Sequence, residues 1–219
     1  MSLERTPEPE YMDLPEEAQA YAAADFSDVN SAFVDRLCEL APGNAPCWAV
    51  DLGAGPGDIA CRMAVRRPDW RIAAVDVSRP MLAYAQRTRA NTVWPLCCDV
   101  KRLPFPDHFA DVLMSNCILH HMPDPLPLWR EVLRIGRPGA LVFFRDLARP
   151  ESADAAAAIV ARYAADESEL LREEYYRSLL AAFTVQEVRE QLDCLGIGEK
   201  LTVEMASDRH LDVHGALPA

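Results

Sequence analysis

The feature that most constrains the fold is a run of three glycines at alternate positions, Gly53, Gly55 and Gly57. The apolar segment 47–50 before it is typical of a buried strand, and segment 59–65 after it is typical of the start of a helix. Glycines at such a junction let the chain turn sharply and bring bare backbone against a ligand. Because a helix N-terminus also presents free N–H groups, the loop suits an anionic group of that ligand.

The spacing of the glycines separates two classes of nucleotide-binding loop. A dinucleotide fingerprint has the order Gly-x-Gly-x-x-Gly, whereas this chain has Gly-x-Gly-x-Gly with Asp51 two residues ahead. The arrangement resembles motif I of the class I S-adenosylmethionine-dependent methyltransferases, acidic-x-Gly-x-Gly-x-Gly. The resemblance implies cofactor contacts from Asp51, Gly53, Ala54, Gly55 and Gly57, with the loop against the methionine part of the cofactor. A glycine-rich turn without function is the structural alternative.

The composition limits the size of the protein and the kind of partner. The chain has 219 residues, half of them apolar, which is enough for one α/β domain with a full core. A formal net charge of -12 argues against nucleic acid, because phosphate contacts need clustered Lys and Arg. No run approaches the roughly 20 apolar residues of a membrane span, and the N-terminus lacks the apolar core of a signal peptide. The seven cysteines show no Cys-x-x-Cys pair, which favours free thiols, a cytoplasmic location and no metal site.

The N-terminal arm is predicted to be helical and carries much of the negative charge. Its first 40 residues hold ten acidic side chains and two arginines. We expect residues 1–9 to be loosely held, a helix over residues 11–25, and a second helix with Ser27 or Asp28 as its N-cap. The arm is either a solvated helix face or a lid over the active site. As a lid it would place three aromatic side chains in the pocket: Tyr11, Tyr21 and Phe26.

A carboxylate follows the second predicted strand, residues 70–77, at a position that suits a nucleoside. Asp76 lies about 20 residues past the glycine loop, the distance at which nucleoside-binding α/β units place a carboxylate on ribose hydroxyls. A carboxylate can accept both hydrogen bonds from a vicinal diol. Val77 and Met81 would then enclose an adenine. An ordinary strand-end aspartate is the alternative.

A second carboxylate follows the third predicted strand, residues 92–97. In the resembling family an aspartate at this place bonds the adenine amino group, and Asp99 matches it. The resemblance also implies that Val100 flanks the adenine ring. For Asp99 the alternative is a loop cap.

Two adjacent histidines follow the fourth predicted strand, residues 109–115. The segment from Ser115 to His121 resembles motif IV and the following region of the family, which implies cofactor contacts from Ser115 and Asn116. It lacks the Asn/Asp-Pro-Pro-Tyr form of enzymes that methylate amino groups of DNA and protein, which favours a small-molecule acceptor. His120 and His121 lie where α/β sheets bind ligands, and imidazole can take a proton from a hydroxyl or amine. Structural roles for both remain the alternative.

Asp146 completes the set of catalytic candidates, with His120 and His121. It ends the fifth predicted strand, residues 141–144, which follows a turn predicted at residues 137–140. Asp146 would polarise one of the histidines or bind the nucleophile. The alternative is a salt bridge to a neighbouring arginine, Arg145 or Arg149.

The remaining chain predicts a helical insertion at residues 150–183 and a C-terminal helix and strand hairpin at residues 184–219. We expect the insertion to build the substrate chamber, lined by Tyr163, Tyr175 and Tyr176. The C-terminal helix begins with a capping box formed by Thr184 and Glu187. With an arm or lid at residues 1–45 and a cofactor-binding core at residues 46–148, these segments form one methyltransferase domain over residues 1–219.

The resemblance implies a fold and an activity. The expected fold is an α/β, Rossmann-like three-layer sandwich, with a mostly parallel seven-stranded sheet and an antiparallel C-terminal hairpin. The expected activity is S-adenosylmethionine-dependent methyl transfer to an O or N atom of a small molecule, with S-adenosylhomocysteine as product. A nicotinamide-dependent oxidoreductase and a non-catalytic S-adenosylmethionine-binding module are the alternatives. A homodimer stays open.

Overall fold

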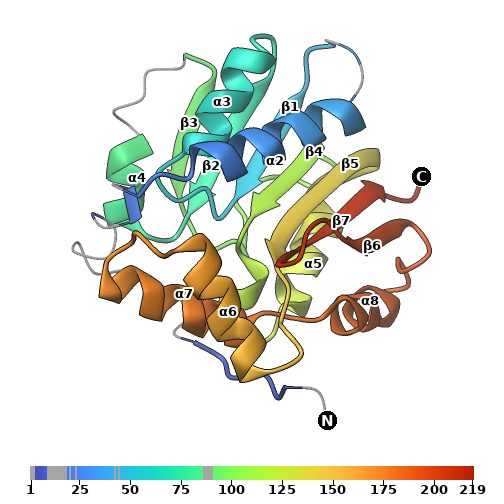
Figure 1. Cartoon of the computed structure of the whole chain (residues 1–219). Coiled ribbons are helices and arrows are strands. Elements are labelled where there is room, and N and C mark those ends of the chain that lie inside the picture. The colour runs from blue at the N-terminus through green and yellow to red at the C-terminus, as the bar shows by residue number, and fades with distance from the viewer. Residues whose placement is uncertain are drawn as a thin grey trace.

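A seven-stranded sheet forms the centre of the molecule (Figure 1). The computed structural model describes residues 3–8, 19, 21–22, 24–41, 43, 45–85 and 91–219. The strands are β1 (Trp48–Leu52), β2 (Arg71–Asp76), β3 (Val93–Cys97), β4 (Ala110–Asn116), β5 (Gly136–Leu147), β6 (Leu201–Met205) and β7 (His210–Ala216). Their order is β3-β2-β1-β4-β5-β7-β6, and β1 to β5 are parallel. The predicted fold class, including the antiparallel C-terminal hairpin, is confirmed.

Helices cover both faces of the sheet because the side chains of the central strands alternate between two apolar faces. The helices are α2 (Ser27–Leu40), α3 (Asp58–Arg66), α4 (Arg79–Ala85), α5 (Leu126–Ile135), α6 (Ala153–Tyr163), α7 (Glu169–Ala181) and α8 (Val185–Cys194), with a 3₁₀ turn, η1 (Leu119–His121). On β1, Ala49 packs with α2 and α3, whereas Val50 and Leu52 pack with α5 and α8. Figure 1 shows these helix pairs on opposite sides of the sheet.

The sheet has a topological switch point between β1 and β4. The chain runs outward from β1 to β2 and β3 and then returns to β4 on the other side of β1. In open α/β sheets ligands bind at this point, beyond the carboxyl ends of the strands. The pair α6 and α7 lies beyond the same ends of β4 and β5 (Figure 1), and Leu147 at the end of β5 packs with Val160 and Leu179 of this pair.

The N-terminal residues 3–8 are held against the molecule, so the prediction of a loose segment at residues 1–9 is wrong for this part. Thr6 donates its backbone N–H to the carbonyl of Leu180 at 3.0 Å. Arg149 donates to the carbonyl of Leu3 at 2.9 Å. The segment takes part in both hydrogen bonds through its own backbone atoms, which explains why its polar composition does not predict its attachment.

The start of α2 also differs from the prediction. Its N-cap is Phe26, which makes no side-chain cap hydrogen bond, whereas Ser27 and Asp28 lie inside the helix. The carboxylate of Asp25 accepts a hydrogen bond from the backbone of Ser27 at 2.9 Å. The helix predicted over residues 11–25 falls mostly outside the described residues.

The turn predicted at residues 137–140 belongs to β5, so that prediction is wrong. Ala110 of β4 pairs with Gly136, and Val112 pairs with Leu141, so the intervening residues of β5 bulge out of the ladder. Gly139 has a φ of +79°, which a glycine adopts without strain. Residues typical of turns thus form a bulge within a continuous strand.

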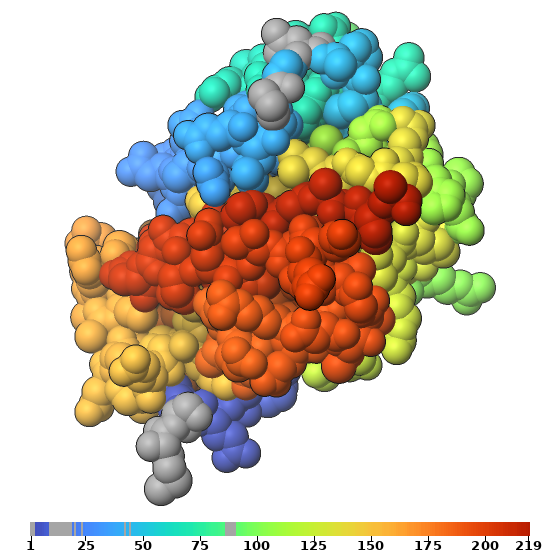
Figure 2. Space-filling view, turned by 90° about the vertical axis from the view of Figure 1, so that its right-hand side faces the viewer, coloured from blue at the N-terminus to red at the C-terminus, as the bar shows by residue number. Residues whose placement is uncertain are grey.

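The C-terminal hairpin closes one edge of the sheet, with β7 between β5 and β6. Figure 2 shows β6 and β7 in red across the middle of this face, with α8 below them in orange-red. Across the described ranges, no helix is both long enough and apolar enough to span a membrane.

Replacing Thr184 by alanine is expected to lower the stability of the protein moderately. The predicted capping box is present: Thr184 Oγ1 accepts from the backbone of Glu187 at 3.2 Å, and Glu187 Oε2 accepts from the backbone of Thr184 at 2.8 Å. Loss of such a cap costs about 1 kcal/mol, which corresponds to a fall in the melting temperature of about 2–4 °C for a domain of this size. Scanning calorimetry measures the melting temperature of the variant. An unchanged melting temperature would show that the capping box gives no net stabilisation.

Candidate functional site

A cavity of about 1200 Å³ opens beyond the carboxyl ends of the parallel strands. It extends from the glycine loop, along the ends of β2 and β4, to the turn η1 and helix α7. The predicted site residues that line it are Asp51, Gly53, Ala54, Gly55, Asp76, Val77, Met81, Asp99, Val100, Asn116, His120 and His121. Three predicted residues, Gly57, Ser115 and Asp146, are not among the lining residues.

The three glycines of the loop serve different purposes. All have positive φ values, +72° at Gly53, +52° at Gly55 and +79° at Gly57. A Cβ at Gly53 would lie 2.7 Å from Ile118, and a Cβ at Gly57 would lie 2.8 Å from Ala85, so these two positions permit close packing. A Cβ at Gly55 would meet nothing within 4 Å. Gly55 therefore leaves bare backbone beside open space.

Asp76 holds the glycine loop from the end of β2. Its Oδ2 accepts a hydrogen bond from the backbone of Gly55 at 2.7 Å, and its Oδ1 accepts one from the backbone of Ser78 at 2.8 Å. Burial raises the pKa of Asp76 above its ordinary value, against the effect of these hydrogen bonds. Each carboxylate oxygen has a further lone pair, so Asp76 can also accept hydrogen bonds from a ligand.

Asp51 is a buried carboxylate at the end of β1. Its side chain lines the cavity, and its Oδ2 atom has no hydrogen-bond partner among the described residues. Burial first, and then the negative charge of Asp76, raise the pKa of Asp51 to about 7. A buried oxygen without a partner is costly, so this position favours a ligand with a hydrogen-bond donor.

Asp51→Asn is expected to change how stability depends on pH. The folded protein, with a pKa of about 7 at Asp51, keeps a proton that the unfolded chain, with the ordinary value of 3.8, has already lost. The Asp51 carboxyl group therefore contributes stability that is fully present below its pKa in the unfolded chain. This stability is lost as the pH rises through the pKa of Asp51 in the folded protein. Between about pH 5 and about pH 8 the unfolding free energy of the variant should rise relative to the wild type by on the order of 2 kcal/mol. Urea unfolding at the two pH values measures this, and a difference that is independent of pH would contradict it.

Asp99, Asn116 and Ser115 lie at or near the ends of the strands that border the cavity, and each makes a different contact. Asp99 accepts a hydrogen bond from the backbone of Lys101 at 2.8 Å, so it caps its loop and also lines the cavity. Asn116 Nδ2 lies 3.4 Å from the side-chain oxygen of Asn30 on α2. Ser115 is fully buried and donates its hydroxyl to the carbonyl of Leu52 at 2.6 Å, so it links β4 to β1.

Asp146 is hydrogen-bonded to His120 in the interior. The distance from His120 Nδ1 to Asp146 Oδ1 is 2.5 Å. Asp146 also accepts backbone hydrogen bonds from Leu119 at 2.6 Å and Leu147 at 2.8 Å. Burial alone lowers the pKa of His120 and raises that of Asp146, but the charges and hydrogen bond of the pair outweigh it, so the pKa of His120 is raised and that of Asp146 is lowered.

The alternative partners proposed for Asp146 are engaged elsewhere. Arg145 makes two hydrogen bonds of 2.7 Å to Asp212 of β7. Arg149 pairs with Glu187 at 2.5 Å. Asp146 therefore contacts a histidine, as one interpretation predicted, while the arginines of the alternative salt bridge pair with Asp212 and Glu187.

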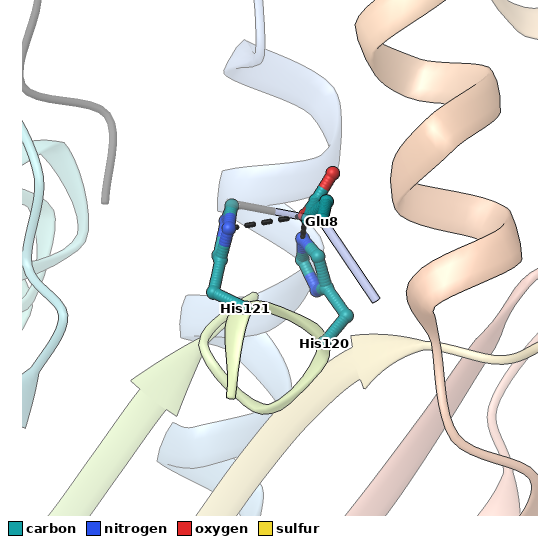
Figure 3. Close-up of side chains that lie close together, drawn as sticks. All are labelled: Glu8, His120 and His121. Atoms are coloured by element: carbon teal, nitrogen blue, oxygen red, sulfur yellow. Dashed lines mark ion pairs between the residues drawn. The ribbon is translucent and has the colours of Figure 1, made fainter. Parts of the chain in front are cut away.

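Glu8 is a site residue that the sequence analysis missed. Its Oε1 atom lies 3.0 Å from His121 Nδ1 and 3.6 Å from His120 Nε2 (Figure 3). Burial alone would raise the pKa of Glu8, but the two histidines outweigh it and lower the pKa. The serine hydroxyl of Ser178 on α7 contacts the same carboxylate at 3.2 Å.

Arg5 attaches the segment that carries Glu8 to the turn that carries the histidines. Its guanidinium donates to the carbonyls of Met122 at 2.8 Å, His120 at 3.1 Å and Ala181 at 2.6 Å. It also lies 3.8 Å from the centre of the Phe183 ring. An arginine bound to backbone carbonyls leaves no recognisable sequence pattern, which is why this contact escaped prediction.

The aromatic residues predicted for the pocket are only partly brought together. Tyr21 and Phe26 line the cavity, as do Tyr163 and Tyr175 from the helical pair. Tyr176 packs instead against the apolar cluster of α6 and α7. The remaining aromatic residue predicted for the lid, Tyr11, lies outside the described residues.

Comparison with known proteins identifies a methyltransferase domain at residues 50–144. Malonyl-[acyl-carrier protein] O-methyltransferase of Marinomonas sp. (strain MWYL1) is 30% identical over 127 residues, which cover 57% of this chain and 47% of that protein. 27-O-demethylrifamycin SV methyltransferase of Amycolatopsis mediterranei (strain S699) is 29% identical over 57% of this chain and 47% of that protein. The matches therefore span about half the length of these curated relatives.

Solved structures share the fold over nearly the whole chain. An S-adenosylmethionine-dependent methyltransferase of Aquifex aeolicus has a TM-score of 0.69 at 16% identity, covering 93% of this chain and 98% of that one. The plantazolicin methyltransferase BpumL, solved with S-adenosylhomocysteine and a triazolic desmethylPZN analog, has a TM-score of 0.74 at 13% identity, covering 94% of this chain and 92% of that one. Residues 50–144 therefore match the methyltransferase domain family, and the whole chain shares its fold with solved S-adenosylmethionine-dependent methyltransferases.

Proposed function

We propose that this protein transfers a methyl group from S-adenosylmethionine to an oxygen or nitrogen atom of a small molecule. The observation that carries the proposal is one continuous cavity that joins the glycine loop to the histidine pair. Methyl transfer requires cofactor and acceptor to meet in line within one site, because the reacting atoms must come into contact.

The residues on the cofactor side of the cavity fit S-adenosylmethionine. The bare backbone at Gly55 leaves room for the methionine part, and the unpartnered oxygen of Asp51 would accept a hydrogen bond from its ammonium group. Asp76 would accept hydrogen bonds from the ribose hydroxyls and Asp99 from the adenine amino group. Met81 would lie against the adenine ring.

The residues at the histidine end of the cavity would bind the acceptor and remove its proton. The sulfonium centre of the bound cofactor supplies an electrophilic methyl group, so the protein has to align the acceptor and remove its proton. We assign these tasks to His120 and His121, with Asp146 as a positioning residue that holds the ring of His120. The acceptor's lone pair forms the bond to the methyl carbon while the carbon–sulfur bond breaks, and the acceptor's proton passes to an imidazole.

An oxygen acceptor is favoured over nitrogen. The names of the two curated relatives describe methylation at oxygen: one is an O-methyltransferase, and the other acts on a 27-O-demethyl compound. Both relatives are about twice as long as the matched region, so their acceptors support only the reaction type.

Titration calorimetry followed by a turnover assay tests the proposal. The protein should bind S-adenosylhomocysteine and should not bind NAD(H), since the glycine spacing departs from the dinucleotide fingerprint. It should then transfer labelled methyl groups to members of a panel of small hydroxy, carboxylic and amino compounds. Binding of NAD(H) alone would favour an oxidoreductase, and binding of S-adenosylhomocysteine without any turnover would favour a non-catalytic module.

Other expectations from the sequence remain predictions. They are the homodimer, the absence of a nucleic-acid partner, the cytoplasmic location, and the division of the chain into arm, core, insertion and C-terminal segment. The net charge of -12 supports a small-molecule acceptor over nucleic acid.

A further inference from the structure

We propose that Glu8, His120 and His121 bind a divalent transition-metal ion of the zinc type. One carboxylate oxygen and two imidazole nitrogens lie within 4.8 Å of one another. Figure 3 shows the three side chains converging, with the histidines on the turn η1 and Glu8 approaching from the N-terminal segment. The spacing of the cysteines predicted no metal site, since it says nothing about a carboxylate that lies far from the histidines in the sequence.

The spacing of the donor atoms suits a small ion. Zinc–nitrogen and zinc–oxygen bonds are about 2.0–2.2 Å long, so neighbouring donors in a tetrahedral site lie about 3.4 Å apart. The two distances from Glu8 Oε1, 3.0 Å to His121 Nδ1 and 3.6 Å to His120 Nε2, bracket that value. Only small side-chain shifts would be needed to bring the three atoms around one ion.

Two nitrogen atoms of the cluster face the same carboxylate oxygen, Glu8 Oε1. His121 Nδ1 is buried and, although it lies 3.0 Å from this oxygen, makes no well-aligned hydrogen bond with a described residue. His120 donates from Nδ1 to Asp146, so in its neutral form the lone pair of Nε2 points toward the carboxylate of Glu8. A cation between these atoms would satisfy both nitrogens and the carboxylate together.

The surroundings have the features that support metal ligands. A metal-bound histidine usually donates its other ring N–H to a carboxylate, which fixes the ring orientation, and Asp146 occupies this position beside His120. Arg5 attaches the segment of Glu8 to the carbonyls of His120 and Met122, so the ligands from both ends are held together before an ion binds. The side chains of Glu8 and His120 are only 6% and 4% exposed, which protects the site from competing water.

The donor set indicates the class of ion and its use. Two imidazoles and one carboxylate suit zinc and neighbouring first-row ions better than magnesium or calcium. Three protein ligands leave a coordination position open, as in catalytic zinc sites. The role of the ion rests on the proposed function: the open position would hold the acceptor oxygen, and the ion would lower the pKa of that oxygen so that its proton passes to water. The two imidazoles would then act as metal ligands, and the ion would take over the activation of the acceptor.

Metal binding is tested on the full-length protein after removal of metals with a chelator. Titration calorimetry with zinc chloride should give one site per chain, and cobalt(II) should give a visible absorption band typical of nitrogen and oxygen ligands. Glu8→Gln and His121→Ala should each weaken zinc binding by about 100-fold or more, since each removes one of three ligands. His214→Ala is the matched control, because His214 lies 3.1 Å from Glu204 in a surface His–Glu pair and should bind zinc as the wild type does.

Each outcome of this experiment decides the proposal. Absence of stoichiometric binding, or binding unaffected by Glu8→Gln and His121→Ala, would overturn it. A cobalt spectrum with thiolate charge-transfer bands would also overturn it, because it would assign the ion to the free cysteines. Circular dichroism shows whether the variants are folded. Titration of the metal-free protein with S-adenosylhomocysteine separates this proposal from the proposed function, since cofactor binding does not depend on the ion.

Discussion

Asp146→Asn is expected to lower kcat for methyl transfer by about 100-fold or more while leaving the affinity for S-adenosylhomocysteine unchanged. Asp146 accepts hydrogen bonds from His120 Nδ1 and from the backbone N–H groups of Leu119 and Leu147. Asparagine keeps the size of the side chain but replaces one acceptor oxygen with an N–H donor. The new amide nitrogen must face either Leu119 or the pair His120 and Leu147. In either orientation the neutral amide lacks the negative charge that stabilises the imidazolium of His120 formed on proton transfer.

The loss of a buried acceptor will also affect folding, so a matched control is needed. Glu131→Gln removes a carboxylate that accepts from the backbone of Leu103 at 2.6 Å and pairs with Arg134, away from the cavity. Both variants should lose about 1–3 kcal/mol of unfolding free energy. Only Asp146→Asn should lose turnover in steady-state assays. A folded Asp146→Asn protein with the wild-type kcat would show that the contact with His120 is structural.

Asp76→Ala is expected to weaken binding of S-adenosylhomocysteine by about 10- to 100-fold, or about 1–3 kcal/mol. In the proposed site, the variant would leave two ribose hydroxyls without their acceptor. It also leaves the backbone N–H of Gly55 without its partner, a hydrogen bond of 2.7 Å, so the glycine loop becomes less well ordered. Both effects weaken the binding of S-adenosylhomocysteine.

Asp69→Ala provides the control for Asp76→Ala in titration calorimetry. Asp69 is an exposed carboxylate just before β2, at the opposite end of the strand from Asp76. Its removal changes the net charge of the protein by the same amount without touching the cavity. If both variants bind S-adenosylhomocysteine as tightly as the wild type does, the ribose assignment of Asp76 is wrong.

The sheet could be predicted because its signals are local. Strands β1, β2 and β4 are short apolar runs. Strand β1 leads through Leu52 into the glycine loop, and β2 and β4 end at Asp76 and Asn116, two polar residues that line the cavity. The capping box at Thr184 is likewise contained within four residues. The bulge in β5 was missed because proline and glycine are as typical of a bulge as of a turn.

The site was predicted less completely because part of it depends on contacts between distant segments. Asp146 lies near the end of β5 and His120 on the turn η1 that follows β4, so parallel pairing of β4 and β5 brings them together. Glu8 reaches the same point only through hydrogen bonds of Arg5 to backbone carbonyls, and a carbonyl has no residue type to recognise. Ser115 lies in the predicted segment, but the alternation of the strand turns its side chain toward Leu52 and away from the cavity.

A crystal structure of the protein with S-adenosylhomocysteine tests the central claim most directly. We expect the methionine part against the backbone of Gly55, the ribose hydroxyls within hydrogen-bond distance of Asp76, and the adenine amino group beside Asp99. The sulfur atom should face the end of the cavity that His120 and His121 line. A nucleoside bound elsewhere, with Asp76 and Asp99 in contact only with their own loops, would contradict the account.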